Sequence, residues 1–89
     1  MRKYLNRGAL VKAIQGRESG EIFLILNADE EYAYLVNGKS RTIEQPKKKN
    51  KKHLYLLLKS EDVNLDLDSL TNAHIIKYIK DYNKSRDYK

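Results

Sequence analysis

The stretch GALVKAIQGRESGEIFLI, from Gly8 to Ile25, carries the clearest structural pattern in the chain. Two apolar runs, Ala9–Ile14 and Ile22–Leu26, flank a polar segment that is bounded by Gly16 and Gly20. Apolar runs separated by a short segment containing glycine predict a β-hairpin. Glycine at both ends of the turn predicts positive φ angles there, or a close backbone approach where a Cβ would clash.

The remaining apolar runs extend this hairpin to five strands. The hairpin itself accounts for strands at Ala9–Gln15 and Glu21–Asn27. The pair Asn37-Gly38 is typical of a type I′ turn, which needs positive φ at both central residues, and it separates predicted strands at Tyr32–Val36 and Lys39–Ile43. Pro46 should end this ladder, because it has no N–H to donate. A nearly continuous apolar run predicts the fifth strand, His53–Leu58, and five short strands with tight turns predict a small barrel.

The C-terminal third of the chain has a different pattern. An acidic segment, Lys59–Asp68, precedes apolar residues at helical spacing: Ala73, Ile75, Ile76, Ile79 and Tyr82. Ser69 or Thr71 is suited to cap this helix. The apolar stripe is expected to pack on the barrel, and binding of a partner is the alternative. The chain therefore divides into a basic lead-in (residues 1–7), a barrel (residues 8–58), and an acidic linker with a C-terminal helix (residues 59–89).

The lead-in, Arg2–Arg7, is expected to be loosely ordered, with Tyr4 and Leu5 covering one end of the barrel. The chain of 89 residues is long enough for one domain with one small core. It has no cysteine, so disulfides and thiolate metal sites are excluded. No apolar run is long enough for a signal peptide or a transmembrane helix, and we expect a cytoplasmic protein.

The net charge of +6 is unevenly distributed. Residues 45–59 contain six basic residues and no acidic one, whereas residues 21–44 contain two basic and five acidic residues. Positive charge concentrated in one segment is typical of proteins that bind polyanions. The alternative is a basic surface that only keeps a small domain soluble.

The glycine pattern of the first hairpin resembles the KOW motif. The resemblance rests on Gly8, Val11, Gly16 and Gly20, then on Val36–Lys39 and on the run from Pro46 to Leu54. It covers residues 8–58, and it is closest to bacterial relatives of the eukaryotic and archaeal large-subunit ribosomal proteins that carry a KOW domain. The resemblance implies a mostly β, SH3-like (KOW-type) barrel whose motif positions here are Gly8, Gly16, Gly20, Asn37 and Gly38. It also implies binding to RNA, ribosomal RNA above all.

Five lysines fall within six positions: Lys47, Lys48, Lys49, Lys51 and Lys52. Like charges repel, so this block is expected to form an exposed loop between the fourth and fifth strands. Each ammonium that neutralises a phosphate releases condensed counterions, which makes the segment suited to grip a nucleic-acid backbone. A mobile, solvated loop without a partner is the alternative.

Other basic residues are candidates for the same binding face: Arg17, Lys39, Arg41 and Lys12. Arg17 is favoured, because a guanidinium can fork onto phosphate and stack on bases. Its alternative is a surface ion pair with Glu18 or another carboxylate. Three tyrosines, Tyr32, Tyr34 and Tyr55, could stack on unpaired bases, although half-buried core positions are the commoner use of tyrosine in small barrels.

No pattern indicates catalysis, a metal or a cofactor. The histidines His53 and His74 lie in different elements and belong to no recognisable triad or metal motif. Phosphate-binding glycine loops are also absent from the sequence. We therefore expect an RNA-binding protein that is not an enzyme, has no membrane partner and is a monomer when free. The alternative is a protein-interaction module of the translation or transcription machinery, with ribosomal proteins among its partners.

Overall fold

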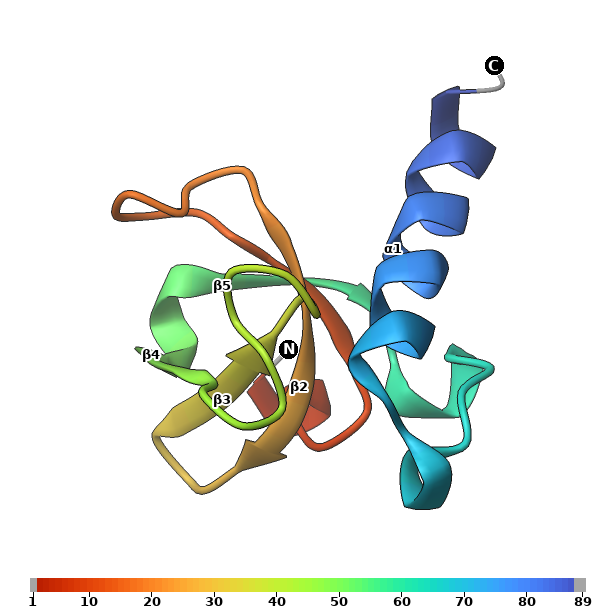
Figure 1. Cartoon of the computed structure of the whole chain (residues 1–89). Coiled ribbons are helices and arrows are strands. Elements are labelled where there is room, and N and C mark those ends of the chain that lie inside the picture. Colours follow the sequence, from red (N-terminus) through yellow and green to blue (C-terminus); the bar gives the residue numbers. More distant parts are fainter. Residues whose placement is uncertain (1, 88–89) are drawn as a thin grey trace.

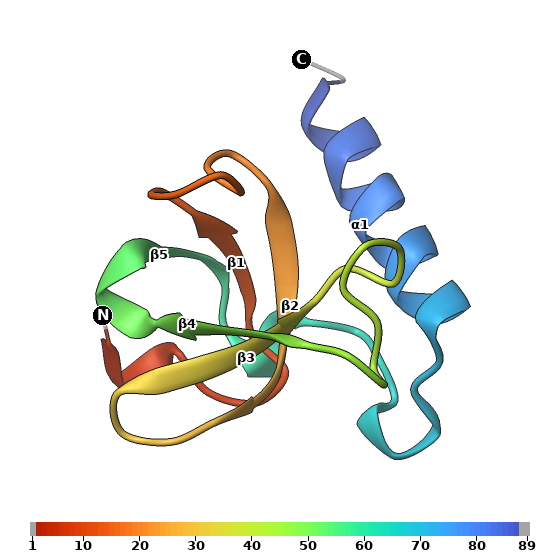
Figure 2. The same cartoon turned by 60° about the vertical axis from the view of Figure 1, so that its left-hand side comes forward.

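The computed structural model describes residues 2–87; Met1, Tyr88 and Lys89, at the ends of the predicted lead-in and C-terminal segment, lie outside the described residues. Within this range five strands and one long helix carry the fold, joined by four short 3-10 helices (Figures 1 and 2). The elements are η1 (Arg2–Tyr4), β1 (Leu10–Ala13), β2 (Ile22–Ala28), β3 (Tyr32–Val36), β4 (Lys47–Asn50), η2 (Lys51–His53), β5 (Leu54–Leu58), η3 (Ser60–Asp62), η4 (Leu67–Ser69) and α1 (Asn72–Asp87). No helix in residues 2–87 has the length and apolar character needed to span a bilayer.

The strands form one antiparallel sheet in the order β4-β3-β2-β1-β5. Val11 of β1 lies opposite Phe23 of β2 on one side and opposite Leu56 of β5 on the other. Register shifts in the β1–β5 and β2–β3 ladders increase the local twist, and the sheet is strongly curled (Figure 2). A single 3-10 turn, η2, connects the two edge strands. The prediction of a mostly β, barrel-like fold of five strands with a C-terminal helix is confirmed.

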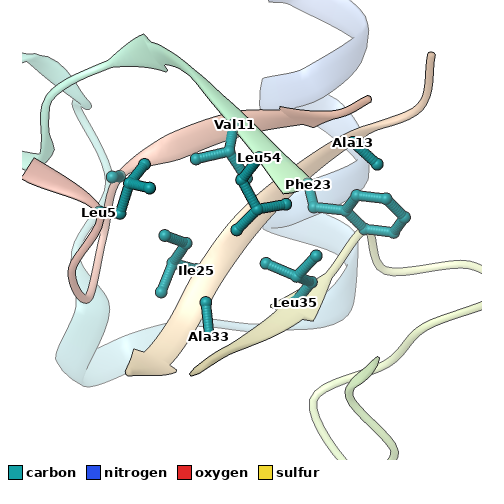
Figure 3. Close-up of a cluster of buried hydrophobic side chains, with 9 residues drawn as sticks. Leu5, Val11, Ala13, Phe23, Ile25, Ala33, Leu35 and Leu54 are labelled. Atoms are coloured by element: carbon teal, nitrogen blue, oxygen red, sulfur yellow. The ribbon is translucent and has the colours of Figure 1, made fainter. Parts of the chain in front are cut away.

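The curled sheet encloses the main hydrophobic core (Figure 3). Alternate residues of β1, β2 and β3 point into it because side chains alternate across a strand. The buried members are Ala9, Val11, Ala13, Phe23, Ile25, Ala33, Leu35 and Leu54. Leu5, which follows η1 and is 1% exposed, closes one end of this core, as predicted. The lead-in is thus ordered around Leu5, and the expectation of a loose segment is wrong.

Helix α1 packs against part of the outer face of the sheet, around Leu10, Leu24 and Val36 (Figure 1). Leu10, Leu24 and Val36, which alternate with the main-core residues, form a second buried cluster with Ile75 of α1. Ile75 is fully buried, so the apolar stripe of the helix serves as core, as expected. Ala73 is the exception in the predicted stripe, because it is exposed.

Two residues fix the start of α1. The Oγ1 of Thr71 accepts a hydrogen bond from the N–H of His74 at 3.1 Å, which makes Thr71 the cap. Asn72 ties the helix to the loop after β3: its Oδ1 accepts from the N–H of Ile43 at 2.9 Å, and its Nδ2 donates to Glu44 at 3.0 Å. The bond from Asn72 lowers the pKa of the Glu44 carboxyl below its usual value.

The fourth strand does not lie where the sequence predicts. Residues 39–43 form a loop whose only bridge pairs Thr42 with Gln45, whereas the fourth strand is β4, Lys47–Asn50. Pro46 therefore precedes a strand instead of ending one. The expectation that residues 47–52 form an exposed loop is wrong, because they form β4 and the start of η2. Strand β4 lies at the edge of the sheet. Lysines are tolerated on an edge strand, where their ammonium groups reach water or a carboxylate.

The turn at Asn37-Gly38 also differs from the prediction. Gly38 has a φ of +84°, but Asn37 is not among the positive-φ residues, so this is not a type I′ turn. The Oδ1 of Asn37 instead accepts hydrogen bonds from the N–H groups of Lys39 and Arg41, both at 3.0 Å. This side chain organises a wider loop and moves the next strand further along the chain.

The first hairpin is confirmed, although its strands are shorter than predicted at their turn end. Gly16 and Gly20 have φ angles of +88° and +93°, as expected from their positions at the ends of the turn. The turn extends beyond the sheet in both views (Figures 1 and 2). Glu18 lies in this turn, between Gly16 and Gly20.

Candidate nucleic-acid interface

Strand β4 distributes the predicted lysines over two faces of the sheet. Its register with β3 places Lys47 opposite Leu35 and Lys49 opposite Ala33, on the side of the main core. Lys48 lies opposite Tyr34, on the outer side. This division follows from the two-residue period of a strand. The lysine run is thus not one continuous basic surface.

The two lysines on the core side reach the carboxylate of Glu18 in the β1–β2 turn. The Nζ of Lys49 donates to Oε1 at 3.0 Å, and the Nζ of Lys47 lies 3.5 Å from Oε2. Nη2 of Arg41, in the loop after β3, lies 3.7 Å from the same Oε2. The hydrogen bond from Lys49, assisted by the charges of Lys49 and Lys47, lowers the pKa of Glu18 from 4.5 to about 2. We call Glu18, Arg41, Lys47 and Lys49 the Glu18 cluster.

Tyr32, Tyr34 and Lys48 form a second surface, which we call the β3–β4 face. Both tyrosines are half-buried, and the Nζ of Lys48 lies 4.4 Å from the centroid of the Tyr32 ring. Asp29, in the β2–β3 turn, borders this face. Its pKa is lowered because Oδ1 accepts hydrogen bonds from the N–H groups of Tyr32 and Glu31, with the charge of Lys48 contributing. The face therefore combines aromatic rings with an exposed cation.

The last two lysines of the run lie in η2. Asn50 caps this turn, with its Oδ1 accepting from the N–H of Lys52 at 3.0 Å. Lys51 is buried, at 8% exposure, and its N–H donates to the carbonyl of Glu31 at 3.0 Å. Lys52 is exposed. Of the five lysines, Lys48 and Lys52 are the two exposed residues.

The other predicted site residues divide between several surfaces. Arg41 joins Lys47 and Lys49, as described above. Arg17 is exposed in the β1–β2 turn, and within residues 2–87 the ion pairs of Glu18 go to other cations, so the predicted alternative of an Arg17–Glu18 pair does not form. Lys12 lies on β1 between Ile22 and Tyr55 of the neighbouring strands. The structure does not bring Lys12 into the Glu18 cluster.

Lys39 lines a groove of about 790 Å³ between the β1–β2 hairpin and α1. The groove has apolar side chains from both elements and basic ones from α1; its lining includes Ile22, Ile76, Ile79, Lys80 and Lys84. Lys39 is therefore separated from the lysines of β4 by its place beside the helix.

Glu18 is the residue of this region that sequence reasoning did not identify as central. The two-residue period of a strand would have placed Lys47 and Lys49 on one face, but only once residues 47–50 were assigned to a strand. No local signal indicates that the turn between β1 and β2 folds toward β4, since that contact joins residues distant in the sequence.

Within residues 2–87 no group of three or more acidic or histidine side chains is placed to hold a metal ion. No protein-family model matches the chain, and no curated protein matches it.

Proposed function

We propose that this protein binds RNA through the β3–β4 face together with two exposed cations of other segments, Lys52 of η2 and Arg17 of the β1–β2 turn. The observation that carries the proposal is the arrangement of Lys48 over Tyr32 and opposite Tyr34, on an open strand face. Proteins that bind single-stranded RNA combine cations that follow the phosphates with aromatic rings on which bases stack. The β3–β4 face has both.

The contact between Lys48 and Tyr32 is compatible with this role. A cation–π contact at an exposed site contributes only about 0.5–1 kcal/mol, so Lys48 can turn from the ring to a phosphate at little cost. The ring that it leaves is then open to a base. Asp29, whose pKa is lowered in part by the charge of Lys48, borders the face instead of lying in it.

Ribosomal RNA is the RNA that the resemblance to the KOW motif favours. Co-sedimentation of the protein with large ribosomal subunits, resistant to moderate salt, would support this choice. Binding to free RNA without any association with ribosomes would assign the protein to another RNA and leave the binding proposal in place.

The basic side chains can be tested by charge removal. The variant Lys48→Gln/Lys52→Gln/Arg17→Gln changes three exposed side chains. We expect its affinity for a fluorescently labelled oligouridine to fall at least about tenfold at low salt. The slope of log affinity against log salt should become shallower by at most about 2, since each phosphate contact on a single strand contributes about 0.7. Fluorescence anisotropy at several salt concentrations measures both quantities.

The matched control removes the same charge from another surface. Lys77→Gln/Lys80→Gln/Lys84→Gln changes three exposed residues of α1 and lowers the net charge equally. If the control loses as much affinity as the β3–β4 variant, the protein attracts RNA only through its overall charge, and the proposed face is wrong.

The stacking contribution is separable from the phosphate contribution. Tyr34→Leu should weaken binding by about 1–3 kcal/mol for each base that no longer stacks, with an unchanged salt slope. Tyr55→Leu is the control, because Tyr55 is 51% exposed on β5, outside the β3–β4 face. Equal effects of the two substitutions would contradict stacking on this face.

A protein partner is the second candidate, and the groove beside α1 is the observation that favours it. Its apolar residues, Ile22, Ile76 and Ile79, could receive an apolar side chain of a partner. Salt separates the two functions, because phosphate contacts weaken steeply with salt and an apolar contact does not.

A further inference from the structure

The Glu18 cluster contains more positive than negative charge. Arg41, Lys47 and Lys49 surround one carboxylate, and within residues 2–87 Glu18 is their only acidic partner at ion-pair distance. The three cations come from the loop after β3 and from β4, whereas the carboxylate comes from the β1–β2 turn. The cations thus form a site with a single anion supplied by another segment.

Lys47 and Lys49 lie on the side of β4 that faces the core, where a lysine contributes less to packing than an apolar residue would. Lys47 and Lys49 occupy the strand positions opposite Leu35 and Ala33, both fully buried in the main core. An apolar side chain at these positions would extend that core. The Lys49 side chain is only 9% exposed, and a cation so covered needs a negative partner.

The turn that supplies the carboxylate makes no backbone hydrogen bond to the strand that carries the two lysines. The Glu18 turn lies between Gly16 and Gly20, and its backbone hydrogen bonds are local: Ser19 N–H to Gly16, Glu21 N–H to Glu18 and Gly20 N–H to Ala13. None of these bonds joins the turn to β4. The Glu18 side chain can therefore leave the cations by rotation of its own torsions, with the backbone of the turn in place.

We propose that Arg41, Lys47 and Lys49 form a binding site for an RNA phosphate, which the carboxylate of Glu18 occupies in the free protein. A phosphate diester and a carboxylate both accept charge-assisted hydrogen bonds from ammonium and guanidinium groups. An incoming phosphate replaces the bonds that Glu18 gives up, and the released carboxylate regains its hydration in water. The Glu18 carboxylate thereby competes with the phosphate for the three cations and lowers the affinity of this site for polyanions. This inference rests on the proposed function, because it adds a second contact point for the same ligand.

The test compares two charge-neutralising substitutions in one hairpin. Glu18→Gln frees the three cations, whereas Glu21→Gln removes an exposed carboxylate that makes no ion pair within residues 2–87. Both raise the net charge by one. We expect Glu18→Gln to bind labelled oligouridine at least about threefold more tightly than Glu21→Gln at low salt. Its salt slope should be steeper by about 0.7 for each additional phosphate that the freed cations neutralise.

A double variant confirms which groups bind the phosphate. Adding Lys49→Gln to Glu18→Gln should return the affinity and the salt slope toward those of the unmodified protein. Circular dichroism on each variant checks that the fold is retained.

The outcomes separate the inference from the proposed function. If the unmodified protein binds RNA but Glu18→Gln behaves as Glu21→Gln does, Glu18 only stabilises the fold and the inference is wrong. If neither the unmodified protein nor Glu18→Gln binds RNA at low salt, both proposals are wrong. If Glu18→Gln binds more tightly but Lys49→Gln does not reverse the increase, the three cations are not the phosphate site.

Discussion

The Nζ of Lys49 in β4 and the Oε1 of Glu18 in the β1–β2 turn lie 3.0 Å apart. The two residues belong to segments that are not neighbours in the sheet, because β3 lies between β4 and the first hairpin in the strand order. The pair therefore joins the turn of the first hairpin to an edge strand of the sheet. Its contribution to stability should depend on pH.

The first prediction concerns acid. The pKa of Glu18 is about 2 in the folded protein against an ordinary value of 4.5, so the unfolded chain takes up this proton first as the pH falls. The stability that the carboxylate supplies is thus complete above pH 4.5 and is lost between pH 4.5 and about 2. The difference in unfolding free energy between the unmodified protein and Glu18→Gln should shrink over that range. Urea denaturation at a series of pH values measures it, and a difference that does not change with pH would contradict the assignment.

The second prediction separates the two faces of β4. Lys49→Gln should destabilise the fold by about 1 kcal/mol, since a hydrogen bond between charged groups is lost while Arg41 and Lys47 still partner Glu18. Lys48→Gln removes an exposed cation and should change the stability by no more than about 0.5 kcal/mol. Denaturant midpoints for the two variants give the comparison. Equal effects would mean that the Glu18 cluster adds nothing to stability.

The third prediction concerns two glycines with similar φ angles and different surroundings. A Cβ on Gly20, φ +93°, would meet no atom within 4 Å, whereas a Cβ on Gly38, φ +84°, would lie 2.5 Å from the carbonyl oxygen of Asn72 in α1. Gly20→Ala should cost about 1 kcal/mol from backbone strain alone. Gly38→Ala should cost at least about 1 kcal/mol more, because the helix must shift. Thermal or urea unfolding tests the order, and a Gly20→Ala variant as unstable as Gly38→Ala would refute the close approach.

The fourth prediction concerns the docking of α1. Ile75 is fully buried between the helix and the sheet, so Ile75→Ala should destabilise the protein by about 2–5 kcal/mol. Ile14, which is 47% exposed after β1, is the control, and Ile14→Ala should change the stability by about 0.5 kcal/mol or less. A stable Ile75→Ala variant that only loses a binding partner would instead identify α1 as an interaction helix.

Much of the fold could be predicted because its signals are local. The continuous apolar run of residues 22–26, the two glycines of the first turn and the helical spacing around Ile75 each act over a few residues. Leu5 could be placed on the core because it is the leucine of an otherwise polar lead-in. These features need no knowledge of distant contacts.

The position of the fourth strand could not be predicted, because it depends on contacts between residues that are distant in the sequence. Asn37-Gly38 is typical of a hairpin turn, but the conformation of this loop depends on the hydrogen bonds of the Asn37 side chain and on the close approach of α1 to Gly38. The lysines of β4 repel one another locally, and Glu18, from a distant turn, compensates two of them. The candidate site therefore contains most of the predicted cations, but their division between two faces follows from tertiary structure.

The pairing of β1 with β5 also sets the order in which the chain can fold. The strands β1 to β4 each pair with the next strand along the chain, but Val11 meets its second partner, Leu56, only after the whole barrel segment exists. Closing so long a loop costs chain entropy that is recovered only when the ladder forms. During synthesis one edge of β1 therefore remains unpaired until β5 has emerged. A nascent chain that ends at Asn50 would still lack Leu54, and the main core would remain open on that side.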